Sequence, residues 1–204
     1  FKLKPKCISE WYSINVEVSN SKLTPIPLGL ANNFSEGNLH PEDNLNYYKN
    51  FKEKSRFDLI YCNFNATTNI KRKEYIEFAK GKNYFNFIES KLNKIDFIKD
   101  LFKYKFTLTP QGVGVDTHRF WESLYAGSIP VAENHLIYNS YFSNYYQPFG
   151  NIEEVKLEHL QKITIDSSLL EKLNIDYWIS IIKKNYINSN ESVLIKSNDN
   201  KLRK

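Results

Sequence analysis

Apolar residues recur in two patterns along the chain from residue 56 onward. Short apolar or alternating runs, which are typical of strands, lie at 57–63, 84–88, 104–109 and 128–132. Apolar residues three or four positions apart, which are typical of helices, lie at 71–80, 95–102, 118–126, 157–163 and 168–186. Strands that alternate with such helices predict an α/β fold, in which helices cover both faces of a parallel sheet.

The chain before residue 56 differs from the rest. One alternating stretch, 14–18, predicts a strand. The two prolines and the glycine of 23–29 exclude a helix interior or a central strand, and the polar residues of 31–50 predict a loop. We therefore divide the chain into a connector or the end of an N-terminal domain (1–55), the α/β domain (56–187) and a polar C-terminal tail (188–204).

Composition narrows the classes of function. The 204 residues are 41% hydrophobic and 25% charged, which is typical of a globular protein. No run approaches the roughly 20 apolar residues of a membrane helix, so we expect no transmembrane span. Two cysteines are too few to predict a disulfide framework. The four histidines are dispersed, so the sequence does not predict a zinc site. The net charge of +5 permits a phosphate-bearing ligand, but the scattered basic residues do not predict a nucleic-acid partner.

Ligands bind at the carboxyl ends of the strands in a parallel sheet, and two such ends carry unusual polar sequence. After the strand at 104–109, Gly112 and Gly114 would let the backbone come close to a ligand. The helix that begins near residue 118 offers unpaired N–H groups and the positive end of its dipole, which suit a phosphate. Either Asp116 or Thr117 is expected to be its N-cap.

Two charged residues follow in this helix. Arg119 can hold a pyrophosphate through charge-assisted hydrogen bonds. Glu122 lies three residues later on the same face, where it can accept both hydroxyls of a ribose. The alternative is a surface ion pair between Arg119 and Glu122, which would contribute little to stability.

The second polar strand end begins at Asn63, after the strand at 57–63. Asn65, Thr67 and Asn69 could donate to phosphate or sugar oxygens, with Arg72 behind them. The alternative is an ordinary capped loop between a strand and a helix.

Residues 106–131, FTLTPQGVGVDTHRFWESLYAGSIPV, closely resemble the donor-binding signature of exostosin-like glycosyltransferases. The shared pattern is a strand, Pro-x-Gly-x-Gly, Asp-Thr-His-Arg, a Trp-Glu-x-Leu helix closed by glycine, and Ile-Pro-Val. The Asn-Phe-Asn-x-Thr-Thr-Asn loop at 63–69, Ile-Pro-Leu-Gly at 26–29 and Asp-Tyr-Trp-Ile at 176–179 resemble further parts of that family.

The resemblance implies a GT-B fold of two Rossmann-like domains, of which this chain carries the C-terminal, donor-binding one. It implies an inverting transfer of a sugar from a nucleotide sugar to a glycan or other hydroxyl acceptor, with no metal or other cofactor. In such an enzyme Arg119 is catalytic because it neutralises the diphosphate leaving group, and Glu122 takes the ribose hydroxyls. Gly112, Gly114 and His118 line the phosphate and the sugar.

The chain is short for a complete enzyme of this kind, so we expect it to lack most of the acceptor domain and any catalytic base. The alternative is a non-catalytic module that binds a nucleotide sugar or a glycan. Glycosylation sequons occur at Asn33, Asn65 and Asn190, but a glycan on Asn65 would block the donor loop. This and the two free cysteines favour the cytoplasm; the alternative is the Golgi or ER lumen, as part of a longer anchored protein.

Overall fold

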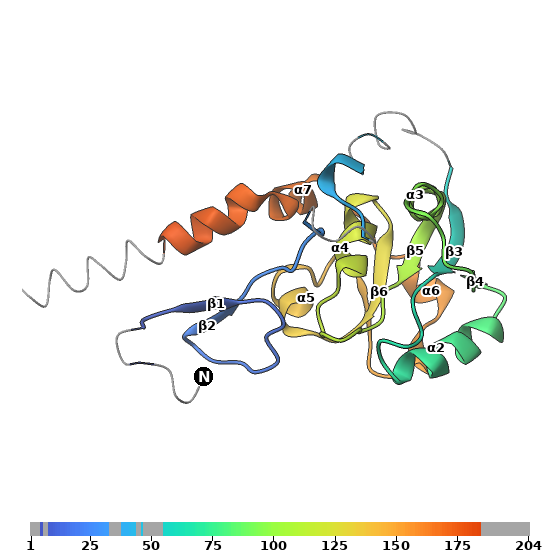
Figure 1. The fold of residues 1–204 in the computed structure, drawn as a ribbon, viewed down its shortest axis with the longest axis horizontal. Helices are drawn as coiled ribbons and strands as arrows, with labels where there is room; N and C mark the ends of the chain where they lie inside the picture. The colour runs from blue at the N-terminus through green and yellow to red at the C-terminus, as the bar shows by residue number, and fades with distance from the viewer. Residues whose placement is uncertain (1–4, 6–7, 33–37, 44–45, 47–54, 185–204) are drawn as a thin grey trace, which may run out of the picture.

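The computed structural model describes residues 5, 8–32, 38–43, 46 and 55–184. Its centre is a five-stranded sheet in the order β4-β3-β5-β6-β7, and every neighbouring pair of strands is parallel (Figure 1). The strands are β3 (Phe57–Cys62), β4 (Phe85–Phe87), β5 (Tyr104–Leu108), β6 (Ile129–Glu133) and β7 (Gln147–Phe149). The predicted α/β, Rossmann-like fold is confirmed.

Helices cover both faces of this sheet. They are α2 (Lys71–Lys80), α3 (Lys94–Lys103), α4 (His118–Tyr125), α5 (Leu136–Tyr141), the 3₁₀ turn η1 (Ile152–Glu154), α6 (Leu157–Leu160) and α7 (Ser167–Leu173). Helix α2, η1 and α6 pack on one face, and α3, α4, α5 and α7 pack on the other. Among the described residues, no helix is both long and apolar enough to cross a membrane.

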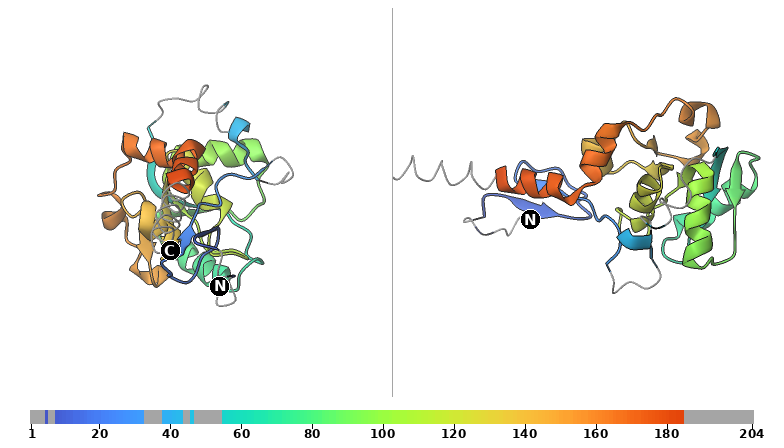
Figure 2. Two further views of the ribbon diagram at one scale, coloured as in Figure 1. Left: turned by 90° about the vertical axis from the view of Figure 1, so that its left-hand side faces the viewer. Right: turned by 90° about the horizontal axis from the view of Figure 1, so that it is seen from above.

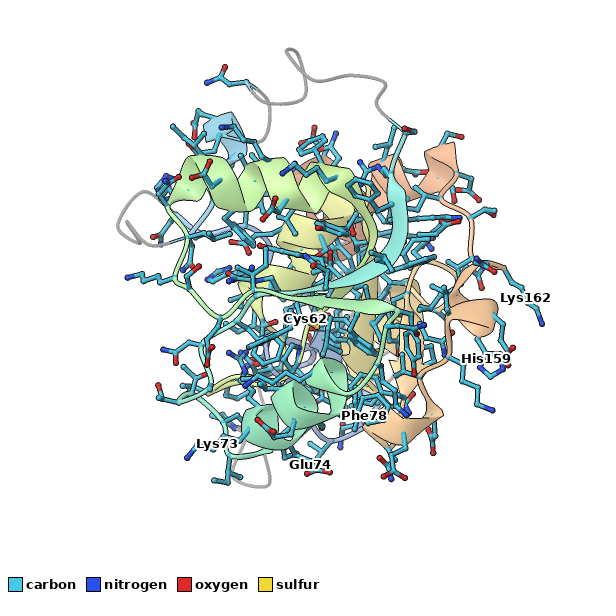
Figure 3. All side chains as sticks on the ribbon, turned by 90° about the vertical axis from the view of Figure 1, so that its right-hand side faces the viewer. Cys62, Lys73, Glu74, Phe78, His159 and Lys162 are labelled. Carbon is cyan, nitrogen blue, oxygen red and sulfur yellow. The ribbon has the colours of Figure 1, made fainter. Side chains whose placement is uncertain are left out.

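The alternation of side chains along the strands explains the two layers, since neighbouring side chains point to opposite faces. In β3, Ile60 and Cys62 join the α2 face, whereas Tyr61 packs against α3 on the other. Figure 3 shows Cys62 inside the fold, with Lys73 and Glu74 on the outer side of α2. Because these central strands are covered on both faces, each one is largely apolar.

The helix boundaries follow from local chemistry. The Asn93 side chain caps α3 by accepting the backbone N–H of Asp96. Helix α4 ends before Gly127, whose φ of +71° is the left-handed conformation expected of a glycine that closes a helix. Both the helix at 118–126 and its closing glycine are thus confirmed.

The N-terminal segment, residues 8–32, contains a small parallel pair of strands, β1 (Trp11–Ser13) and β2 (Leu23–Pro25). The strand predicted at 14–18 is wrong, because the chain bends there and Asn15 adopts a φ of +52°. Residues 175–184 form a helix that runs beside this segment (Figures 1 and 2). Ile26 and Leu28 pack against the apolar cluster that includes Trp178 of that helix.

Other local predictions needed correction. The single helix predicted at 168–186 is interrupted at Asn174, whose extended backbone separates α7 from the helix at 175–184. Helix α5, strand β7 and η1 were not predicted, and residues 41–43 are helical within the predicted loop at 31–50. The C-terminal tail at 188–204 lies outside the described residues, and the domain boundary at residue 55 stays a prediction.

Candidate functional site

The strand order reverses between β3 and β5. From β3 the chain passes through α2 to β4 on one side, and then returns through α3 to β5 on the other side. Ligands of open α/β sheets bind at such a switch point, outside the carboxyl ends of the strands. The two polar loops singled out in the sequence follow β3 and β5, so the topology brings both of them to this point.

Arg72 joins the two loops. Its side chain is 7% exposed, and its guanidinium donates to the carbonyls of Asn65 (2.9 Å), Pro110 (2.8 Å) and Gln111 (2.7 Å). The neighbouring Asn69 side chain donates to the carbonyl of Gly112 at 3.1 Å. Burial, followed by the nearby charge of Arg119, lowers the pKa of Arg72 to about 10. Arg72 therefore fixes the shape of the site rather than facing it as a free cation.

The other polar residues of the first loop also bond within the protein. Asn63 donates to the carbonyls of Ile88 and Ser90, both at 2.9 Å. The Asn65 side chain accepts from the backbone N–H and the hydroxyl of Thr67. These bonds match the alternative of an ordinary capped loop.

The N-terminus of α4 has one of the two predicted residues at its N-cap position but lacks a side-chain capping bond. Thr117 occupies the N-cap position but makes no side-chain capping bond, and its buried hydroxyl has no hydrogen-bond partner among the described residues. The prediction that either Asp116 or Thr117 is the N-cap is therefore confirmed for Thr117, although without a side-chain bond. Asp116 does not cap the helix. Its side chain is 2% exposed and accepts from Leu28 N–H (2.8 Å), Trp121 Nε1 (2.8 Å) and the Tyr138 hydroxyl (2.9 Å).

The environment of Asp116 is unusual for a carboxylate. Burial raises its pKa to about 6, although the three hydrogen bonds to the carboxylate oppose that rise. Its own backbone N–H donates to Asn15 Oδ1 at 2.8 Å. Asp116 therefore connects α4 to α5 and to the N-terminal segment.

The two glycines lie against side chains of the protein itself. A Cβ on Gly114 would lie 2.5 Å from Asn15 Oδ1, which is closer than atoms can approach. A Cβ on Gly112 would lie 3.2 Å from Arg72 Nη2. The sequence suggested a close ligand at these positions, whereas the structure places protein side chains there. His118, also predicted to face the ligand, places Nδ1 2.8 Å from the carbonyl of Gly29.

Arg119 and Glu122 lie together on α4, but the pair is not the surface ion pair considered as an alternative. Glu122 is 2% exposed, and its Oε2 lies 3.5 Å from Arg119 Nε. The Arg119 guanidinium stacks 3.9 Å above the ring of Phe97, and its buried Nη1 has no hydrogen-bond partner among the described residues. Arg119 thus has hydrogen-bonding capacity that the described residues leave unused.

Sequence reasoning missed two buried polar residues at the end of β6. Glu133 accepts from the Tyr75 hydroxyl and from the backbone N–H of Gln111, both at 3.1 Å, and so holds the second loop. His135 is buried, and burial lowers its pKa. A carboxylate directly after the apolar run Ile-Pro-Val-Ala was the signal that could have identified Glu133.

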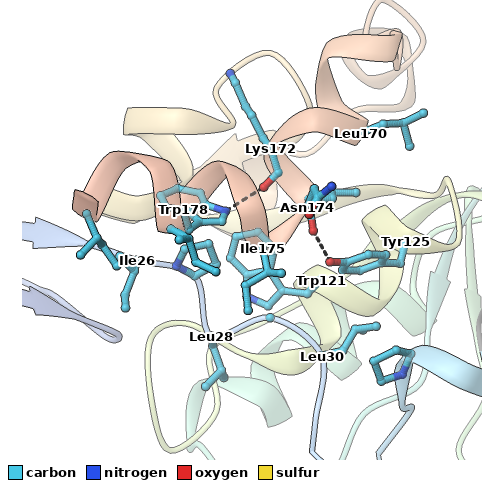
Figure 4. A pocket seen from close by; sticks show the side chains of 16 residues that line it. Ile26, Leu28, Leu30, Trp121, Tyr125, Leu170, Lys172, Asn174, Ile175 and Trp178 are labelled. Carbon is cyan, nitrogen blue, oxygen red and sulfur yellow. Dashed lines mark hydrogen bonds between the residues drawn. The ribbon is translucent and has the colours of Figure 1, made fainter. Parts of the chain in front are cut away.

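A large cavity lies elsewhere, against the outer side of α4. Its volume is about 920 Å³, and it is bounded by residues 26–30, Trp121 and Tyr125 of α4, and the helices on either side of Asn174 (Figure 4). Its walls are mainly apolar, and none of the predicted site residues line it. The candidate site at the switch point is therefore separate from this cavity.

Comparisons with known proteins add no family. No protein-family model matches the chain, and no curated protein matches it. The function therefore has to be argued from the residues and their geometry.

Proposed function

We propose that this chain binds the diphosphate of a nucleotide sugar at the carboxyl ends of β3 and β5, as the donor-binding part of a glycosyltransferase. The sugar would pass to a glycan or another hydroxyl acceptor. The resemblance of residues 106–131 to exostosin-like glycosyltransferases supports the reaction. The positive charges of the arginines near the switch point support the proposal that the ligand is an anion.

Two guanidinium groups, on the helices that follow β3 and β5, are the main support for this proposal. Arg72 and Arg119 are near enough for the charge of one to lower the pKa of the other. Arg72 donates to neutral carbonyls, and Arg119 contacts the Glu122 carboxylate at 3.5 Å. A diphosphate would balance the remaining charge and supply an acceptor for Arg119 Nη1.

This arrangement suits the departure of a nucleoside diphosphate. When the acceptor oxygen bonds to the anomeric carbon, the bond from that carbon to the phosphate oxygen breaks and its electron pair stays on the diphosphate. The acceptor proton passes to a base or to solvent. The charge on the leaving group is stabilised by the Arg119 cation and by the N-terminal end of α4, which is the positive end of the helix dipole.

Calorimetric titration with UDP, GDP, CDP and ADP tests the binding step. We expect one of them to bind at micromolar strength and Arg119→Ala to weaken it at least tenfold, or about 1.4 kcal/mol. Lys73→Ala is the matched control, because Lys73 is an exposed cation on the outer side of α2 and should leave affinity within about twofold. A folded protein that binds none of the four would refute the proposal.

Release of free nucleoside diphosphate from the matching nucleotide sugar then separates an enzyme from a binding module. An enzyme releases the diphosphate repeatedly when acceptor is present, whereas a module binds the sugar nucleotide without turnover. The measurement is made on the chain together with a panel of hydroxyl acceptors. Loss of turnover in Arg119→Ala would tie the activity to this site.

A further inference from the structure

Residues 38–43, called the strap below, contact both α3 and α4. Leu39 is 1% exposed, and its side chain packs among Tyr61, Phe97 and Leu101. The first helical turn after it, residues 41–43, lies beside α3 in Figure 3. The strap is therefore anchored in the core by one apolar side chain.

Two polar contacts also hold the strap. The backbone N–H of His40 donates to Asp43 Oδ2 at 2.9 Å, which organises the turn. The same carboxylate oxygen lies 3.9 Å from Lys94 Nζ at the start of α3. Both contacts are partly exposed, so they fix the position of the strap and contribute little to its stability.

The strap occupies the carboxylate of Glu122. The backbone N–H of Leu39 donates to Glu122 Oε1 at 3.1 Å, while Oε2 faces Arg119 Nε. With only 2% of Glu122 exposed, a sugar hydroxyl cannot reach either oxygen while Leu39 stays in place. A ribose and the Leu39 N–H would therefore compete for the same acceptor.

We propose that the strap is an intrasteric gate: Leu39 blocks Glu122 in the free protein, and binding of a nucleoside diphosphate releases the strap as the ribose hydroxyls replace the Leu39 N–H. This inference rests on the proposed function, because it concerns the same nucleotide site. A ligand that binds only the open state has its apparent affinity reduced by the fraction of molecules that are open. Weakening the closed strap must then tighten nucleotide binding.

Leu39→Ala is the decisive variant, because it removes the apolar anchor but keeps the backbone N–H. We expect the diphosphate that binds the wild type to bind this variant at least tenfold more tightly. Leu160→Ala is the matched control, since Leu160 is fully buried on α6 at the opposite face of the sheet. This control should leave the nucleotide affinity unchanged within about twofold, although it lowers stability.

Hydrogen exchange in the unaltered protein gives a second measurement that needs no variant. The Leu39 amide is buried and hydrogen-bonded, so it should exchange slowly in the free protein. Saturating nucleoside diphosphate should speed this exchange at least tenfold. Amides of β5 in the sheet, such as that of Phe106, should not exchange faster.

The possible outcomes distinguish failure of the gate proposal from failure of the proposed binding site. If wild type and Leu39→Ala bind the diphosphate equally, or if the Leu39 amide becomes more protected, the gate is refuted while the binding site stands. Weaker binding by Leu39→Ala would likewise refute the gate and make the strap part of the site. If neither protein binds any of the four diphosphates, both the proposed function and the gate are refuted.

Discussion

The buried carboxylate of Asp116 should make the stability of this protein depend on pH in an unusual direction. Its pKa is about 6 in the folded chain, against 3.8 for an unperturbed aspartate. Between these values the folded chain keeps a proton that the unfolded chain has released. Raising the pH therefore favours unfolding, so the contribution of Asp116 is fully present below about pH 4 and is lost as the pH passes about 6.

The size of the effect follows from the shift. A difference of about 2 pKa units, at about 1.4 kcal/mol each, predicts that the free energy of unfolding falls by about 3 kcal/mol from this group between pH 4 and pH 7. Most carboxylates that are stabilised in the folded state act in the opposite direction. Asp96 and Asp166, whose pKa values hydrogen bonds lower, are examples. The contribution of Asp116 must therefore be isolated with a variant.

Asp116→Asn removes the titration and keeps the shape. The amide oxygen can still accept from Trp121 and Tyr138, but the amide nitrogen would face the N–H of Leu28, which then loses its acceptor. An unsatisfied buried donor costs about 1–3 kcal/mol. At pH 4 the variant should therefore be less stable than the wild type, and at pH 7 the two effects should nearly cancel.

Urea unfolding followed by tryptophan fluorescence at several pH values between 4 and 7 measures this difference. Trp121 reports directly, because its indole donates to Asp116. Asp176→Asn is the control, since Asp176 is an exposed carboxylate on the helix at 175–184. Parallel stability curves for the wild type and Asp116→Asn over this range would refute the reasoning.

Two further pairs of substitutions, each a test variant and its control, probe the packing. Gly114→Ala places a Cβ against Asn15 Oδ1 and should lower the free energy of unfolding by about 1–3 kcal/mol, with faster proteolysis of the N-terminal segment; Gly150→Ala, whose Cβ would make only ordinary contacts, should be tolerated. Leu101→Ala, in the fully buried contact of α3 with the sheet, should cost about 2–5 kcal/mol in urea unfolding, whereas Ile95→Ala on the exposed side of α3 should cost less than about 0.5 kcal/mol. Equal losses for either pair would contradict the packing described above.

The sheet and its main helices were predictable because their signals are local. The range 71–80 was predicted to be a helix and is one, and β3, β5 and β6 each fall within one residue or so of their apolar runs. Strand β7 escaped prediction because it has only three residues, one of which is Pro148. A run of three residues is too short to show an alternating pattern, and at the edge of a sheet its proline is tolerated.

The sequence was enough to predict which two loops form the candidate site. It was not enough to predict the hydrogen bonds that hold their side chains. Strand order follows from pattern and topology, and it brings the loops at 63–70 and 109–117 together. The partners of Asp116 and Glu122 are Leu28 and Leu39, which lie 88 and 83 residues away and contribute backbone N–H groups. Every residue except proline carries such a group, so no side-chain pattern marks these contacts.

The anchoring of the N-terminal segment has a consequence for how the chain folds during synthesis. Asn15 bonds to a residue 101 positions later, and Leu28 to one 88 positions later. Apolar residues of the N-terminal segment also pack against the cluster that includes Trp178. Contacts of such long range carry a loop-closure entropy cost that falls when the intervening chain is already folded, so they form slowly. The segment that leaves the ribosome ahead of the sheet should therefore be among the last parts to reach its final place.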